Sequence, residues 1–217
     1  MEEKELITLW KTYDKKLEDN LTLNKKNLED ITKIKVKSLL SSMKPIKIFA
    51  VVLGILWVIF VDSLVIDLFE TANAFFLISA GLQAFIIKLA IGIYLYQIII
   101  INRVNISDPI LDTQIRIAKI KSTSIWVTKI LFLQLPLWAT FYLNKSIFEN
   151  AGIYLYILIS VKILLFTFAS IWLYRNIKFE NSNKKWFKLL FNGKEWTPII
   201  KSLQMIEEIK VFRNEES

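Results

Sequence analysis

The chain has 217 residues, of which 54% are apolar, and its 28 basic and 20 acidic residues give a net charge of +8. It contains no Cys and no His, which excludes thiol nucleophiles, His general bases, and zinc or haem sites built on these ligands. A soluble domain is about 45–50% apolar, and here the excess is gathered in long runs. The composition therefore predicts a membrane protein and excludes most enzyme mechanisms, although a site built on carboxylates alone stays open. We expect the protein not to be an enzyme and to need no cofactor.

Four stretches are apolar over about 20 residues, the length that crosses a bilayer. The third contains Pro136, which a span tolerates where its neighbours satisfy the freed backbone groups. The predicted fold class is all-α, a polytopic bundle of four transmembrane helices with amphipathic helices at both ends. The predicted spans cover residues 48–69, 74–101, 125–143 and 153–174.

Charges in the connecting segments predict the orientation, because Lys and Arg accumulate in cytoplasmic loops. Residues 33–47 carry five lysines and no acid, and the tail from Arg175 carries nine basic residues. Loop 102–124 carries four basic residues, whereas Glu70 is the charge between the first two spans. We expect both termini to face the cytoplasm of a bacterial inner membrane, with an N-terminal region 1–44, a membrane domain 45–174 and a tail 175–217.

The first segment predicts an amphipathic helix over residues 2–19. Leu6, Trp10, Tyr13 and Leu17 recur at helical spacing, and we call these four the N-terminal stripe. Residues 20–24 predict a break, with Thr22 or Asn24 as the N-cap of a second helix over 25–43. Because a short helix is marginal alone in water, the stripe should be covered by the chain's own cytosolic helices or by a groove on a partner.

Three further signals predict helices outside the membrane. Ser107-Asp108-Pro109 suits a helix start, from which one helix can run into the third span. Residues 184–191 form a short basic amphipathic stretch that suits anionic lipid headgroups, and Thr197-Pro198 starts a last helix. The predominance of Lys over Arg fits membrane orientation better than direct binding of nucleic acid.

Several charges fall inside the predicted spans, where each costs about 2.5–3.5 kcal/mol at the bilayer centre. They are Asp62, Asp67, Lys88, Lys129 and Lys162. A rise of about 1.5 Å per residue places Asp62 and Lys162 within reach of each other, and Lys88 reaches the same region if its helix tilts. Two interpretations stay open: an ion pair that locks the bundle, or an ion pathway in which lysines line an oligomer.

Three segments carry a resemblance to a known group of proteins. They are Leu9-Trp10-Lys11, then Ser107-Asp108-Pro109-Ile110-Leu111 with Thr113-Gln114, and the run from Leu133 to Trp138. Together they resemble small four-span inner-membrane proteins of AT-rich bacteria that are often encoded beside extracytoplasmic-function sigma factors. The resemblance covers roughly residues 5–175. It implies a membrane anti-sigma role, in which the N-terminal helices hold a sigma factor.

The leading hypothesis is therefore a regulatory membrane protein whose N-terminal stripe captures a cytosolic protein, with a sigma factor as the implied partner. A first alternative is a self-assembling membrane effector or channel, whose copies would bring Lys88 and Lys162 into a conducting path. A second is an accessory subunit of a larger membrane complex.

Overall fold

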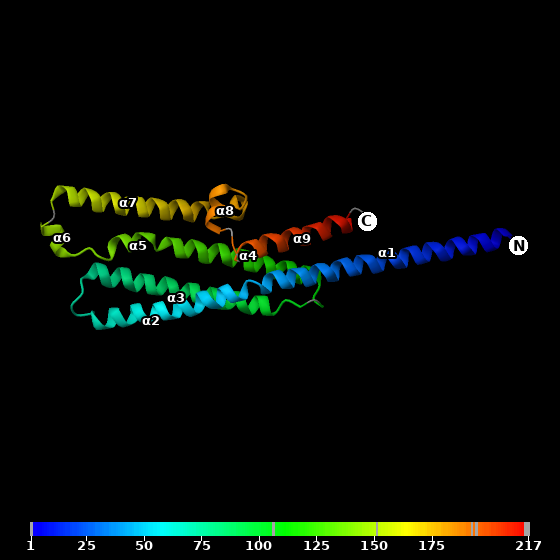
Figure 1. Cartoon of the computed structure of the whole chain (residues 1–217), viewed down its shortest axis with the longest axis horizontal. Coiled ribbons are helices and arrows are strands. Elements are labelled where there is room, and N and C mark those ends of the chain that lie inside the picture. Colours follow the sequence, from blue (N-terminus) through cyan, green and yellow to red (C-terminus); the bar gives the residue numbers. More distant parts are fainter. Residues whose placement is uncertain (1, 106, 151, 192, 194, 215–217) are drawn as a thin grey trace.

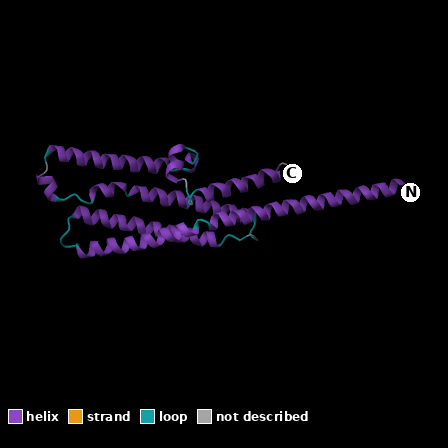
Figure 2. Ribbon diagram, viewed as in Figure 1, coloured by secondary structure: helices purple, strands orange, loops and turns teal. Residues whose placement is uncertain are grey.

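A computed structural model describes residues 2–105, 107–150, 152–191, 193 and 195–214, and every regular element in them is helical (Figure 2). The predicted all-α class is thus confirmed. In chain order the elements are α1 (Glu2–Ser41), α2 (Lys44–Asp67), α3 (Ala74–Asn102), α4 (Ile110–Leu133), α5 (Leu135–Thr140), α6 (Lys145–Asn150), α7 (Ile153–Asn176), the 3-10 turn η1 (Phe179–Asn181), α8 (Lys185–Phe191) and α9 (Thr197–Asn214).

The helices form a layer in which neighbours along the chain lie side by side (Figure 1). α2 packs on α3, α3 on α4, and both α4 and α5 pack on α7, while α9 returns to lie against α1. The long helix α1 projects from one end of this layer, and both termini lie on that side (Figure 1). Three helical stretches are long and apolar enough to cross a membrane, namely Glu3–Asp67, Ala74–Asn102 and Ile153–Asn176.

The helix α1 runs without a break through residues 20–24, so the predicted interruption there is wrong. Residues 2–43 contain neither Gly nor Pro, the two residues that interrupt helices most strongly. The hydroxyl of Thr22 donates to the carbonyl oxygen of Glu18 at 2.9 Å. Its hydrogen bond is therefore made within α1, and the side chain does not cap a new helix. A short turn at Ser42 and Met43 then leads into α2.

The segment predicted as the third span is divided into two helices. α4 ends at Leu133 and α5 begins at Leu135, with Gln134 as the joint. Pro136 has no backbone N–H and its ring opposes a continuous helix, so the interruption falls just before it. The hydroxyls of Ser79 and Thr140 lie 3.0 Å apart and hydrogen-bond α3 to α5 beyond the joint.

A hydrophobic core lies where α1 joins the layer. Val36, Leu40 and Met43 are fully buried and share one face of α1 or of the turn after it. They belong to one cluster with Val104 of the loop after α3 and with residues of the inner ends of α3, α4 and α9, namely Ile100, Ile101, Ile117, Ile120, Ile199 and Ile206. This cluster fixes the base of α1 and the position of α9.

The α2–α3 hairpin depends on small residues along its seam. Ala80 and Ala84 of α3 are buried against Val61 of α2. A Cβ atom on Gly54 would lie 3.1 Å from Cγ1 of Ile91, closer than side chains normally pack. The second helix of the hairpin is capped by Asn73, whose side chain accepts a hydrogen bond from the backbone N–H of Phe76 at 2.9 Å.

We predict that Leu40→Ala destabilises the protein by about 2–5 kcal/mol, because it removes a fully buried side chain from the core at the base of α1. Leu21→Ala, a change on the exposed part of the same helix, should shift the free energy of unfolding by less than about 0.5 kcal/mol. Thermal unfolding of the purified protein in detergent, followed by circular dichroism, measures both. Equal effects of the two changes would contradict this account of the core.

Candidate functional site

The N-terminal stripe lies on a part of α1 that packs against no other described element. The side chains of Leu6, Trp10, Tyr13 and Leu17 are 55%, 66%, 65% and 64% exposed. Residues 3–24 are exposed throughout, and α1 carries them away from the rest of the chain (Figure 1). The N-terminal stripe was expected to be covered either by the chain's own helices or by a partner protein. Among the described residues, no helix of the chain covers it.

The stripe also lies on a different face of α1 from the residues that anchor the helix. Successive residues of an α-helix turn by about 100°, so Val36 and Leu40 lie about 100–140° round the axis from Leu17. The face of the stripe continues instead through Leu21, Leu28 and Ile31, which are exposed as well. The helix thus has one buried face at its base and a second, apolar face that is open along most of its length.

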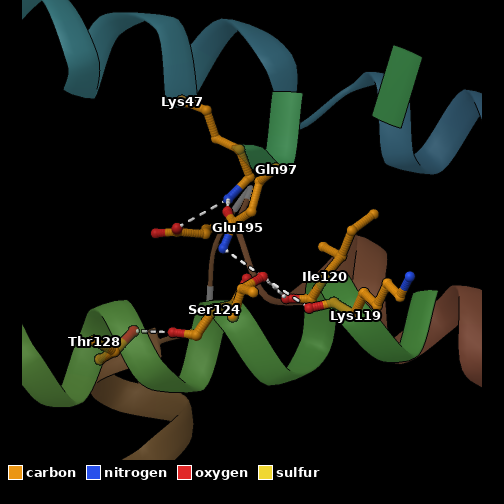
Figure 3. A network of polar contacts seen from close by, with 8 residues as sticks. Lys47, Gln97, Lys119, Ile120, Ser124, Thr128 and Glu195 are labelled. Carbon is orange, nitrogen blue, oxygen red and sulfur yellow. Dashed lines mark hydrogen bonds and ion pairs between the residues drawn. The ribbon is translucent and has the colours of Figure 1, made fainter. Parts of the chain in front are cut away.

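A buried polar junction surrounds Lys47 near the start of α2 (Figure 3). Lys47, in the first turn of α2, has no exposed side-chain surface, and its ammonium lies 3.2 Å from Oε1 of Glu195. The same ammonium donates to Oε1 of Gln97 in α3. Nε2 of Gln97 donates to Oγ1 of Thr123 in α4 at 2.9 Å, and that hydroxyl donates to the carbonyl oxygen of Lys119 at 2.8 Å.

The junction therefore joins α2, α3, α4 and the segment that precedes α9. The ring of Tyr94, with its centroid 4.9 Å from the ammonium of Lys47, adds a cation–π contact. A buried cation is tolerated only where acceptors compensate its lost hydration, and here Glu195 and Gln97 provide them. Because Glu195 is 28% exposed, the carboxylate keeps contact with solvent while the ammonium does not.

Sequence analysis missed this junction. In the sequence Lys47 is one of five lysines that precede the first span, and Glu195 lies between the basic stretch 184–191 and the last helix with nothing to mark it. The signal that was present is Gln97, a lone amide within the uncharged run from Leu89 to Ile101, because a polar side chain in such a run normally faces a partner.

The charges inside the apolar helices pair with near neighbours. Asp62 Oδ2 lies 2.8 Å from Nζ of Lys88, so the ion pair joins α2 to α3. Of the two lysines predicted to lie within reach of Asp62, Lys88 is the one that it meets. The ammonium of Lys162 lies 4.4 Å from the centroid of the Tyr142 ring. That of Lys129 lies 5.2 Å from the centroid of the Tyr174 ring.

The described side chains were also compared with the pattern of a metal site and the chain with known proteins. Within the described ranges, no group of three or more His, Cys, Asp and Glu side chains could hold a metal ion. Comparisons with protein-family models, with curated proteins and with solved structures found no match.

We predict that Glu195→Ala destabilises the protein by about 1–3 kcal/mol, because it leaves the ammonium of Lys47 buried without its counter-charge. Lys47→Met should cost less, since the carboxylate of Glu195 already reaches solvent. The double variant Lys47→Met/Glu195→Leu should recover most of the loss, giving a coupling that a double-mutant cycle of thermal unfolding detects. Lys201→Ala, at an exposed position of α9, is the control; strictly additive effects would refute the coupling.

Proposed function

We propose that this chain is a non-enzymatic regulator of the bacterial inner membrane, with four spans and both termini in the cytoplasm. In this proposal the N-terminal stripe captures a cytosolic protein at the end of α1. The resemblance set out above makes a sigma factor the first candidate for that protein, which would make the chain a membrane anti-sigma factor. The observation that carries the proposal is the open apolar face of α1.

Chain geometry supports a fourth crossing by α4 and α5. The end of α3 and the start of α7 lie at opposite ends of the layer (Figure 1). If α3 and α7 cross the membrane, the segment between them has to cross it as well. α4 and α5 connect these two ends and pack between α3 and α7. An even number of crossings also agrees with two termini on one side, next to the lysine-rich segments.

Charge supports a protein as the partner of the N-terminal stripe. Residues 2–19 contain four basic and six acidic residues, a net charge of −2, although the whole chain carries +8. Anionic lipids would repel such a segment, whereas they attract basic helices. The partner that fits is a cytosolic protein with an apolar groove bordered by basic residues, into which α1 docks as an amphipathic helix. Proteins that bind nucleic acid, sigma factors among them, carry basic surfaces.

The channel alternative draws no specific support from the described residues. Its two lysines are engaged, Lys88 with the carboxylate of Asp62 and Lys162 with the ring of Tyr142. Both arrangements match the first interpretation of these charges, in which they hold helices together. The open face of α1 points to partner capture instead.

The proposed topology predicts which single cysteines react with a membrane-impermeant maleimide, and the native chain contains no cysteine to interfere. In cells whose outer membrane is permeabilised, Thr71→Cys and Lys145→Cys should be labelled. Asn20→Cys and Lys184→Cys should react only after lysis. If α4 and α5 did not cross, Thr71→Cys and Lys145→Cys would fall on opposite sides, and labelling of only one of them would rule out the fourth span.

Partner capture predicts that Trp10→Ala/Leu17→Ala weakens binding more than about 100-fold, because buried aromatic and apolar anchors carry most of the energy of such interfaces. The control is Ile7→Ala/Lys15→Ala, which changes the other faces of the same exposed segment. Quantitative mass spectrometry of proteins purified with each full-length variant identifies a stoichiometric partner. Titration of that partner against the chain in lipid nanodiscs measures the affinity. A partner retained equally by both double variants would overturn the role of the N-terminal stripe.

A further inference from the structure

The ion pair between Asp62 and Lys88 faces outward from the helix layer. Its ammonium and carboxylate approach to 2.8 Å, yet the two side chains are 51% and 40% exposed. Both belong to helices long and apolar enough to cross a membrane. The exposed surface of this pair would therefore face lipid unless something covers it.

The position of the pair makes lipid a poor cover. Asp62 precedes the end of α2 by five residues, and Lys88 follows the start of α3 by 14. At a rise of about 1.5 Å per residue, Asp62 lies about 8 Å and Lys88 about 21 Å from the end of the hairpin where α2 connects to α3. Side chains of a helix lean toward its N-terminus, so Lys88 extends toward Asp62 and the pair lies inside the hydrocarbon, which is about 30 Å thick. Charged groups at this depth normally face protein or water.

We propose that a second copy of this chain covers the pair and that the protein is a parallel homodimer through the outward face of α2 and α3. The argument is charge self-complementarity. Two copies inserted in the same orientation carry their pairs at the same depth. A two-fold axis along the membrane normal then sets Asp62 of each copy beside Lys88 of the other. The four charges alternate in sign, so each gains a second partner of opposite charge.

The surface around the pair lets two backbones approach closely. Gly81 lies two turns before Lys88 and Gly92 one turn after it, all three on the same face of α3, and a Cβ atom on either glycine would meet nothing within 4 Å. Small residues at such positions allow tight packing of transmembrane helices. The exposed side chains of Ile59 and Phe85 flank the pair and supply the apolar contacts of the interface. These features lie beside the α2–α3 seam, where Ala80 and Ala84 are already used within one copy.

Cross-linking in native membranes tests the interface, again because the chain has no cysteine. Phe85→Cys should give a disulfide-linked dimer on mild oxidation. Leu164→Cys, equally exposed to lipid but on α7, is the matched control and should not. Equal cross-linking at both positions, or none at Phe85→Cys, would overturn the proposal.

Two sets of variants test which contacts hold the dimer together. Dimerisation of each variant is measured by energy transfer between labelled copies at decreasing protein-to-lipid ratios. Gly81→Leu/Gly92→Leu keeps the ion pair and fits the open space of one copy, but should weaken the dimer at least about tenfold by blocking the approach. The control, Ser160→Leu, changes a small exposed residue of α7.

The charge test uses Asp62→Lys and Lys88→Asp. Each alone should dimerise at least about tenfold less than the wild type, and mixing the two should restore energy transfer, because opposite signs then face each other. Circular dichroism of each variant confirms that it folds, and Lys88→Arg, which keeps the charge, should still dimerise. A wild type that stays monomeric at all densities, or glycine variants that dimerise normally, would refute the proposal.

Discussion

The ammonium of Lys47 imposes a constraint on much of the rest of the fold. It is withdrawn from water at the start of the first apolar helix, and a cation there is stable only while acceptors from other segments surround it. Gln97 and Glu195 supply these acceptors, and Thr123 holds Gln97 in turn. Meeting this requirement brings the inner ends of α2, α3 and α4 together and draws the tail back to them. α9 is thereby placed against the base of α1, where it completes the core that holds the projecting helix.

Much of the architecture could be predicted because it depends on composition and length along the chain. The apolar runs of α2, α3 and α7 were recognisable in this way, and Thr197-Pro198 marked the start of α9. The preferences of single residues for helix starts and breaks predicted the structure less reliably. Thr22 and Asn24 resemble a helix start, but without a Gly or Pro the helix continues through them. Pro136 was expected to lie within a single span, and the structure instead shows two helices that meet at Gln134.

The polar contacts could be predicted only in part, because sequence gives depth along a helix but not the direction of a side chain around it. Asp62 and Lys162 have compatible depths, yet α7 packs on α4 and α5 while α2 packs on α3. The lysine that Asp62 meets is therefore the one on its hairpin partner. The exposure of the N-terminal stripe was likewise beyond the sequence, since amphipathic spacing predicts a surface to be covered without saying what covers it. The structure adds that α1 anchors itself with a different face.

The continuity of α1 also determines how far its N-terminal end lies from the start of α2. The helix joins α2 through a turn of only two residues, Ser42 and Met43, so it behaves as a rod attached to the membrane rather than as a tether. At about 1.5 Å per residue, Leu17 stands about 45 Å and Leu6 about 60 Å beyond Lys47. A flexible linker of 30 residues would average about 30 Å and sample every shorter separation. Under the proposed function, the rod would keep a partner bound at its tip at a nearly constant distance from the start of α2, which a flexible linker would not do.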